Sequence, residues 1–246
     1  PEGTPEYGVL SWWDYGNWIL YIAKRPVVAN NFQTGIEDSS HFFVTKNESE
    51  SVSILEKRNV KYVITDNLMT IKKSESIFDV AGESYYQGDV PDEYLQEEDI
   101  RETTLIKLHL FDGSKLGNLR LIYESEDASL RINFNESNES NESSYGMSDD
   151  NYTEIKNVKI FEYVPGATIE GFANPGQKVS ARTNVTLSSG RTFEYQNEVM
   201  SNESGWYELK VPYSTTATPY NLNVERYYIV MNESASYIKP VSIDEA

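Results

Sequence analysis

Cysteine is absent from the 246 residues, and histidine occurs only at His41 and His109. The lack of cysteine excludes disulfides, cysteine-ligated zinc, iron–sulfur clusters and thiol nucleophiles. Two histidines far apart in the sequence leave little room for a histidine-based metal site. No run of about 18 apolar residues is present, so no segment is predicted to span a bilayer. The sequence starts with Pro1 and not Met, which we interpret as a piece of a longer polypeptide.

Basic residues are also few: 21 Lys and Arg stand against 39 Asp and Glu, and the formal net charge is −18. Such a chain repels phosphate, so neither a general nucleic-acid-binding surface nor a general anionic-membrane-binding surface is expected. Residues 83–102 and 124–150 each hold eight acids and one base, and together they carry 14 of the 18 net charges. We interpret them as acidic insertions in a body that is close to neutral.

The first part of the chain, residues 1–154, alternates helical patterns with short apolar strands. Pro26 ends the first helical pattern, in which Trp18, Ile19, Tyr21 and Ile22 share one side. Further helices are predicted at 37–45, 50–58 and 67–77, and strands at 27–29, 61–65, 119–123 and 130–134. The segment 103–111 fits either a helix or a strand. The pattern predicts a mainly helical central core with a small sheet.

The second part, residues 155–246, has a different sequence pattern. Short β-rich runs alternate with turn signals such as Pro165-Gly166, Pro175-Gly176 and Ser204-Gly205. The strands are expected at 155–163, 167–172, 178–186, 192–200, 206–211, 226–231 and 236–241. Regular short strands with Gly and Pro turns are typical of a β-sandwich or barrel. The predicted fold class is therefore α+β, with a helical core followed by an all-β peripheral domain.

One short segment, Trp12-Trp13-Asp14-Tyr15-Gly16, carries chemical information. Neighbouring residues of an extended chain point to opposite sides, so the two indoles cannot both face one core. Two indole N–H donors and one carboxylate, on consecutive residues, are suited to bind a single hydroxyl group. The residues alone leave two interpretations open: a packed aromatic core with an aspartate cap, or a binding site.

The same segment matches the WWDYG signature of oligosaccharyltransferase catalytic subunits, and the chain resembles the archaeal AglB family. Asp66-x-x-Met69-x-x-x-Lys73 resembles the variant of the second family motif in which Met stands at the fourth position. Its spacing predicts one helical face. The segments 108–113, 119–124 and 158–167 are also similar to the family, which favours a helix at 103–111. The resemblance covers nearly the whole chain.

The resemblance implies that the complete enzyme transfers a lipid-linked oligosaccharide to the Asn of an Asn-x-Ser/Thr sequon. Trp12, Trp13 and Asp14 would then hold the hydroxyl of the Ser or Thr at position +2. Met69 is the candidate for contact with the Thr methyl group, which predicts a mild preference for Thr over Ser. The supporting residues would be Tyr15, Gly16, Asp66 and Lys73.

The resemblance also implies what this chain would not do alone. In the family, carboxylates of a membrane-embedded half hold a divalent metal, Mn or Mg, so this chain is expected to be inactive by itself, with no metal site and no catalytic residue. The expected partners are an acceptor peptide and a dolichol-linked oligosaccharide, in a single-subunit enzyme of the cell membrane with this domain on the extracellular face. The alternative is a non-enzymatic secreted or cell-surface adhesion module.

The sequence contains eight Asn-x-Ser/Thr sequons of its own, where roughly three or four would arise by chance. We interpret the excess as a sign that the chain is exposed to the glycosylating compartment. The triple Asn-Glu-Ser repeat at 135–143 also fits a polar surface, rich in Ser, Asn and Glu, that acquired the sequon pattern by chance. The possible glycosylation sites are Asn47, Asn135, Asn138, Asn141, Asn151, Asn184, Asn202 and Asn232.

Overall fold

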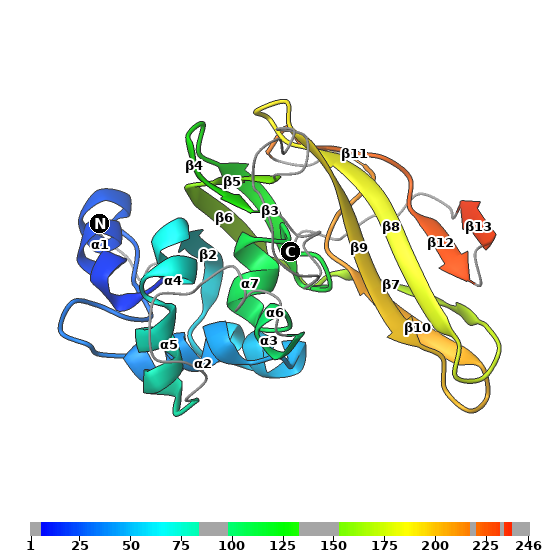
Figure 1. Ribbon diagram of the computed structural model, residues 1–246, viewed down its shortest axis with the longest axis horizontal. Coiled ribbons are helices and arrows are strands. Elements are labelled where there is room, and N and C mark those ends of the chain that lie inside the picture. The colour runs from blue at the N-terminus through cyan, green and yellow to red at the C-terminus, as the bar shows by residue number, and fades with distance from the viewer. Residues whose placement is uncertain (1–5, 84–97, 133–152, 217–219, 232–233, 238–246) are drawn as a thin grey trace, which may run out of the picture.

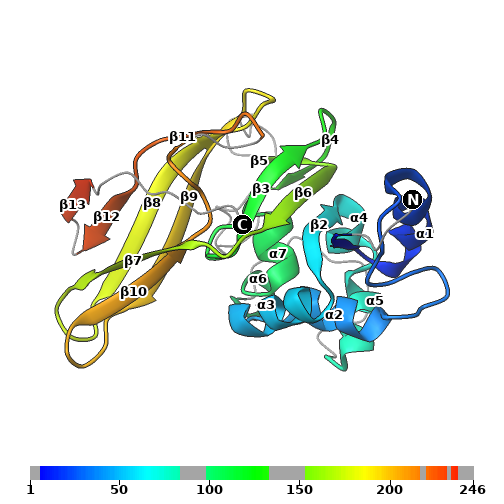
Figure 2. The same ribbon diagram turned by 180° about the vertical axis from the view of Figure 1, so that it is seen from behind.

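A computed structural model describes residues 6–83, 98–132, 153–216, 220–231 and 234–237. Figure 1 shows a helical part at one end, which contains α1, and a β-rich part at the other, which contains β8 and β9. Figure 2 shows the same two parts from behind. The α+β prediction, with a helical core and a β-rich peripheral part, is confirmed.

The helices follow the apolar periodicity of the sequence closely, except in one segment. They are η1 (Trp13–Tyr15), α1 (Gly16–Ala23), α2 (Ile36–Val44), α3 (Glu48–Lys57), α4 (Asn67–Ile71), α5 (Ser74–Ala81), α6 (Glu98–Arg101) and α7 (Thr104–His109). The helices predicted at 37–45, 50–58 and 103–111 are thereby confirmed. A side-chain cap starts α3, where Asn47 Oδ1 accepts a hydrogen bond of 3.0 Å from the backbone N–H of Ser49.

The single helix predicted at 67–77 is wrong. The backbone N–H groups of Lys72 and Lys73 both donate to the carbonyl oxygen of Leu68, at 2.9 and 2.8 Å, and this wider turn ends α4. Lys73 then serves as the residue before α5. Asp66, Met69 and Lys73 therefore do not lie on one helical face, because Asp66 precedes α4 and Lys73 follows it.

The strands divide between a core sheet and the β-rich part. They are β1 (Gly8–Leu10), β2 (Val60–Asp66), β3 (Leu119–Glu124), β4 (Ala128–Ile132), β5 (Thr153–Lys156), β6 (Val158–Tyr163), β7 (Ala167–Phe172), β8 (Lys178–Thr186), β9 (Thr192–Met200), β10 (Trp206–Val211), β11 (Asn223–Val224), β12 (Tyr228–Met231) and β13 (Ser234–Tyr237).

The core sheet has the order β1-β2-β6-β3. β1 and β2 are parallel, and β6 runs antiparallel to both β2 and β3. Val63 and Phe161 are opposite each other in the β2–β6 ladder, and both are fully buried. They belong to the same hydrophobic core as Phe42 of α2, Leu55 of α3 and Leu108 of α7, so these helices cover one face of the sheet.

The expected domain boundary at 154/155 differs from the structure. β6 is an inner strand of the core sheet, between β2 and β3, and β5 pairs with β4. The helical core thus continues to Tyr163, and the peripheral part starts near the turn at Pro165-Gly166. A local β pattern shows that a segment is a strand but not which sheet it joins, because strand pairing is non-local.

The peripheral part is built around the long β8–β9 hairpin. β11 and β12 pair with successive parts of β8, and β7 pairs with β10 in a second small sheet. Tyr195, Tyr213 and Tyr227 are fully buried, and the ring centroids of Tyr195 and Tyr213 are 5.1 Å apart in an edge-to-face arrangement. Two sheets with an aromatic centre confirm the sandwich-like prediction.

Four charged side chains join the two parts, and we name them the Asp112 cluster: Asp112, Glu124, Lys159 and Arg191. Arg191, which immediately precedes β9, donates to both carboxylate oxygens of Asp112, at 2.9 and 2.8 Å. It also donates to Glu124 Oε2 at 2.7 Å. Lys159 of β6 donates to Asp112 Oδ1 at 2.6 Å. The core and the peripheral part therefore share one ionic network.

Candidate functional site

The WWDYG segment and the second motif meet at one edge of the core sheet. Because β1 and β2 are parallel, the residues that follow β1 and those that follow β2 emerge on the same side. Ser11 fixes this arrangement, since its hydroxyl donates to the carbonyl oxygen of Ile64 at 3.0 Å. The hydroxyl of Ser39 in α2 donates to the carbonyl oxygen of Ser11 at 2.9 Å. The two motifs are thus held together by backbone anchors.

The two tryptophans have different environments, as the alternation argument predicts. Trp12 is 2% exposed and belongs to the hydrophobic core, whereas Trp13 is partly buried and packs against that core. Trp12 is in the extended conformation, and Trp13 begins the short helix η1. Trp12 therefore fits the core interpretation, and Trp13 is the more accessible of the two indoles.

Four polar side chains next to the indoles form a second charged group, which we name the Asp14 cluster: Asp14, Tyr15, Asp66 and Lys73. Lys73 Nζ forms an ion pair with Asp14 Oδ2 and donates to the hydroxyl oxygen of Tyr15 at 2.6 Å. The Tyr15 hydroxyl donates to Asp66 Oδ2. Asp66 Oδ1 accepts from the backbone N–H of Met69 at 2.8 Å and so caps α4.

Tyr15 links the two motifs and stays protonated. Burial raises the pKa of Tyr15, and the neighbouring carboxylates of Asp66 and Asp14 raise it further. The ammonium group of Lys73 also lies 4.1 Å from the centroid of the Tyr15 ring. Tyr15 therefore acts as a hydrogen-bond donor that holds Asp66 and an aromatic surface that holds Lys73.

Asp14 is incompletely paired. Its Oδ1 atom is buried and has no hydrogen-bond partner among the described residues, although Oδ2 is paired with Lys73. Removing a carboxylate oxygen from water without a partner costs about 1–3 kcal/mol or more. The Asp14 carboxylate, with 28% of its side chain exposed, thus offers one free acceptor beside the partly buried Trp13.

Sequence reasoning did not identify Asn31, which also positions this segment. Its side-chain NH₂ donates to the carbonyl oxygen of Asp14 at 3.1 Å, and its Oδ1 accepts from the backbone N–H of Asn17 at 3.0 Å. The loop before α2 thereby holds both η1 and the start of α1. An asparagine in a turn gives no sequence signal for this long-range role.

Gly16 and Met69 are both enclosed by other parts of the core. A Cβ atom on Gly16 would lie 2.2 Å from the carbonyl oxygen of Ala29, so only glycine permits this close approach of two segments. Met69 is fully buried in the core and does not lie at the surface of the site. Its contact with an acceptor peptide stays a prediction, and the structure does not bring the Met69 side chain to the surface.

Three of the eight sequons lie in described residues. Asn47 and Asn202 are exposed, at the start of α3 and in the turn before β10. Asn184 is half-buried in β8, and its side-chain NH₂ donates to Glu225 at 3.0 Å. The other five sequons, at 135, 138, 141, 151 and 232, lie outside the described residues.

Two further features concern metals and membranes. In the described ranges, no three His, Asp or Glu side chains come together in a way that could hold a metal ion. The described residues therefore offer no ligand set for the divalent metal that the family resemblance implies. None of the helices within the described part is long and apolar enough to cross a membrane.

Two family models match the chain in order. The AglB core domain matches residues 2–70, and the long peripheral domain of archaeal glycosylation protein B matches residues 166–246. The second match starts after β6, in agreement with the boundary seen in the structure.

The relatives are glycotransferases by name. The chain is 30% identical over 317 residues to dolichyl-phosphooligosaccharide-protein glycotransferase 3 of Archaeoglobus fulgidus, covering 98% of this chain and 36% of that protein. Glycotransferase 1 of the same organism is 41% identical over 135 residues, which cover 53% of this chain and 22% of the relative. The chain therefore spans about a third or less of the length of these relatives. Neither of them is an adhesion protein by name.

Solved structures give the same result. The chain is similar to archaeal oligosaccharyltransferase AglB from Archaeoglobus fulgidus in complex with an inhibitory peptide and a dolichol-phosphate, with a TM-score of 0.76, 28% identity and coverage of 100% of this chain and 37% of that one. It is also similar to an Archaeoglobus fulgidus oligosaccharyltransferase tethered to an acceptor peptide that contains the NVT sequon, with a TM-score of 0.75, 28% identity and coverage of 98% and 37%. The chain belongs to the AglB family of archaeal oligosaccharyltransferases.

Proposed function

We propose that the Trp12–Asp14 segment binds the hydroxyl group of the Ser or Thr at position +2 of an acceptor Asn-x-Ser/Thr sequon. The observation that carries this proposal is the buried Asp14 Oδ1 atom, which has no partner among the described residues. A ligand hydroxyl supplies the donor that this atom lacks. Lys73 pairs with the other carboxylate oxygen, Oδ2, which leaves Oδ1 for the ligand.

The hydroxyl also has acceptor capacity, which the indole N–H groups satisfy. Trp13 is the more accessible of the two, because Trp12 is 2% exposed. We assign Trp13 as the principal donor, and Trp12 as a donor that also forms the wall between the site and the core. An Ala or Val at position +2 leaves these groups unpaired, at about 1–3 kcal/mol for each group.

The proposal includes a preference for Thr over Ser. One buried methyl group contributes about 0.8 kcal/mol, or about fourfold in affinity. Met69 was the candidate for this contact, but its side chain is fully buried. Its replacement by Leu keeps the core volume. An altered Thr-to-Ser ratio in Met69→Leu would support direct contact, and an unaltered ratio would assign Met69 to the core alone.

We further propose that this site serves a dolichyl-phosphooligosaccharide–protein glycotransferase. The support is the peptide and the dolichol-phosphate named in the solved relatives. In this proposal the donor is a dolichol-linked oligosaccharide, and a divalent metal, Mn or Mg, is held by parts of a single-subunit enzyme outside this chain. The chain alone binds sequons without transferring glycan, and it lies on the extracellular face of the cell membrane.

The test is a binding titration with paired peptides that differ only at position +2, one with Asn-Val-Thr and one with Asn-Val-Ala. We expect the chain to prefer the Thr peptide by at least tenfold, and Asp14→Ala to remove that preference without unfolding the chain. Trp13→Phe and Trp12→Phe keep an aromatic ring but remove the N–H, so they separate hydrogen bonding from packing. Asp99→Ala, at an exposed ion pair with Lys46, is the matched control. Equal affinity of the unaltered chain for the two peptides would refute the proposal.

We also propose that the exposed sequons of this chain are themselves glycosylated in the native host. We expect glycan on Asn47 and Asn202, and not on Asn184, whose amide nitrogen donates to Glu225 within the sheet. Peptide mass measurement of the native protein tests this order. Unmodified Asn47 and Asn202 would contradict it.

A further inference from the structure

Helix α1 is apolar and yet exposed. Trp18 is 66% exposed, Tyr21 72% and Ile22 71%, and no residue of Gly16–Ala23 is charged. A helix of this kind in a globular protein is normally covered by other elements. Phe32, in the loop that follows, is exposed as well, and we name these side chains the α1 surface: Trp18, Leu20, Tyr21, Ile22 and Phe32. Large apolar side chains that are exposed in one region mark interaction sites.

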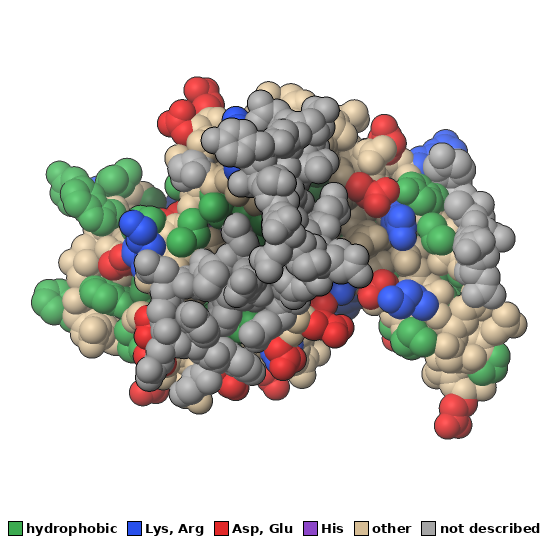
Figure 3. Space-filling model, in the orientation of Figure 1, with side chains coloured by type: hydrophobic (Ala, Val, Ile, Leu, Met, Phe, Trp, Pro, Cys, Tyr) green, Lys and Arg blue, Asp and Glu red, His purple; other side chains and the backbone are tan. Residues whose placement is uncertain are grey.

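Phe32 belongs to this surface because its loop is tied to α1. Asn31 accepts from the backbone N–H of Asn17, at the start of α1, and Phe32 next to it is 85% exposed. Figures 1 and 2 both place α1 and this loop at the end of the molecule opposite the β8–β9 hairpin. On the face shown in Figure 3, hydrophobic side chains gather at that same end.

The α1 surface continues into a groove behind the helix. A cavity of about 580 Å³ lies between α1 and the face of the core sheet that the other helices leave open. Ile19 and Ala23 line it from the helix, and Val9, Ile64 and Ile160 line it from strands β1, β2 and β6. The helix is therefore apolar both on its outer side and toward the sheet.

The charge around α1 differs from that of the rest of the chain. Residues 15–36 contain no Asp or Glu and two bases, Lys24 and Arg25, in a chain whose net charge is −18. Both bases follow α1 directly and lie over aromatic rings: Lys24 is 4.4 Å from the ring centroid of Tyr21, and Arg25 is 4.4 Å from that of Tyr7. The cations and the exposed aromatic rings thus occupy one small region.

We propose that the α1 surface inserts into the interface of a lipid bilayer that contains anionic lipids. Trp and Tyr favour the boundary between headgroups and acyl chains, and Lys and Arg beside them favour anionic headgroups. Eight residues of helix extend about 12 Å, far less than the roughly 30 Å of a bilayer core, so α1 lies in the interface and does not cross it. A second copy of the chain is a poorer occupant, because it brings the same two cations to the contact.

This inference goes beyond sequon recognition and does not depend on it. Asp14 is two residues from the first residue of α1, so insertion of α1 places the acceptor site directly above the membrane surface. The length of peptide that the site accepts is then limited on one side by the bilayer.

The test is co-sedimentation of the 246-residue chain with vesicles of phosphatidylcholine, with and without phosphatidylglycerol. We expect binding that requires phosphatidylglycerol and is accompanied by a blue shift of tryptophan fluorescence. The double variant Trp18→Ser/Tyr21→Ser should lower the partition coefficient at least tenfold, and Lys24→Gln about fivefold.

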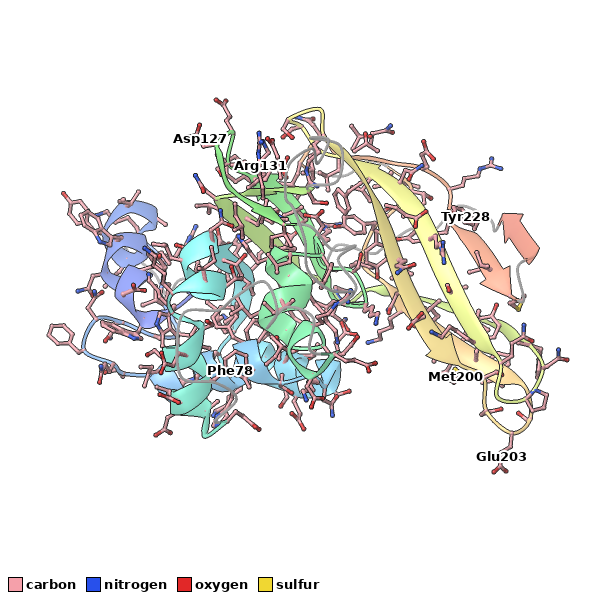
Figure 4. All side chains as sticks on the ribbon, in the orientation of Figure 1. Phe78, Asp127, Arg131, Met200, Glu203 and Tyr228 are labelled. Atoms are coloured by element: carbon pink, nitrogen blue, oxygen red, sulfur yellow. The ribbon has the colours of Figure 1, made fainter. Side chains whose placement is uncertain are left out.

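The matched control lies at the opposite tip of the molecule. Phe172 is 69% exposed and packs against Trp206, and Figure 4 labels Met200 and Glu203 at that tip. Phe172→Ser should leave vesicle binding unchanged. Circular dichroism and sequon-peptide binding, measured on the same samples, separate a failure of this proposal from misfolding or from failure of the acceptor site.

Three outcomes would overturn the proposal. They are absence of vesicle binding by the unaltered chain, equal loss of binding in Phe172→Ser, and concentration-dependent dimerisation that Trp18→Ser/Tyr21→Ser abolishes in the absence of vesicles. The last result would assign the α1 surface to a second copy of the chain.

Discussion

The Asp14 cluster and the Asp112 cluster are built from similar groups but differ in how completely those groups are paired. Each places a lysine against an aspartate, with a second carboxylate nearby. In the Asp112 cluster both oxygens of Asp112 and both oxygens of Glu124 accept hydrogen bonds. In the Asp14 cluster one oxygen of Asp14 has no partner among the described residues.

Burial differs in the same direction. In the lysine–aspartate pairs, the side chains of Lys159 and Asp112 are 2% and 15% exposed, whereas those of Lys73 and Asp14 are 22% and 28% exposed. Burial alone would raise the pKa of Asp112, but the charges of Lys159 and Arg191 hold it below its ordinary value. Asp112 is therefore ionised at neutral pH.

The difference teaches how to separate a structural charge cluster from a binding cluster. A cluster with all of its oxygens paired gains nothing from a ligand and acts in stability. A cluster with one buried oxygen left over gains a hydrogen bond from a ligand. Variants of the two clusters should therefore affect different measurements.

The largest effect is expected from Asp112→Ala. It leaves the buried Lys159 without its carboxylate and breaks the bidentate contact of Arg191, so the free energy of unfolding should fall by about 3–5 kcal/mol. Urea denaturation measures this loss. The control Asp99→Ala removes a carboxylate that is 71% exposed and should cost less than about 1 kcal/mol. Similar losses in the two variants would break the comparison.

The next effect is a pH dependence at His109, whose carbonyl oxygen accepts from Lys159 at 2.6 Å. Its ring lies between Thr65 at 2.9 Å and Asn67 at 2.6 Å, and burial, with the charge of Lys159, lowers the pKa of His109 from 6.5 to about 3. The unfolded chain binds this proton below pH 6.5 while the folded chain does not. The stabilisation is thus complete above pH 6.5 and is lost as the pH falls toward 3, by about 1.4 kcal/mol per pH unit.

His109→Gln keeps one donor and one acceptor but has no proton to bind. Unfolding titrations from pH 8 to pH 4 should therefore show a shallower decline in this variant than in the unaltered chain. Parallel declines would show that the buried ring is not the source of the pH dependence.

The smallest effect is expected from Lys73→Met in the Asp14 cluster. Without the ammonium group, the Asp14 carboxylate loses the contact that fixes Oδ2, and two carboxylates face each other across Tyr15. We expect about a fivefold loss of affinity for the Thr peptide, about 1 kcal/mol, with little change in stability. Lys72→Met, at the exposed neighbour, is the control. A gain in affinity would mean that Lys73 competes with the peptide for Asp14.

Local sequence patterns predicted most of the elements. Apolar periodicity located α2 and α3, the family resemblance decided in favour of a helix at α7, and the Gly and Pro turns located the strands of the peripheral part. The break at Lys72 was not predicted, because two lysines after an apolar turn continue a helical pattern equally well. The position of β6 between β2 and β3 was not predicted either, because it depends on pairing with residues about 40 and about 100 positions away.

The site was predictable from its motifs, but its detailed geometry was not. The spacing of Asp66, Met69 and Lys73 indicated one helical face, which is absent. The parallel pairing of β1 and β2 instead brings this segment next to Asp14 and Tyr15. No sequence pattern indicated that Asn31 positions this segment. Alternation predicted that the two indoles differ in burial, and they do, but the change of direction comes from the start of η1 at Trp13 and not from an extended strand.

The place of β6 also dictates how this chain is to be cut and joined. The core sheet is complete only after Tyr163 has been synthesised, so on the ribosome the helices that cover β2 wait for a strand encoded about 100 residues later. A chimera joined at residue 154 would take the inner strand of the sheet from the wrong parent. A join at Pro165-Gly166 exchanges the peripheral part as an intact module and leaves the sheet to one parent.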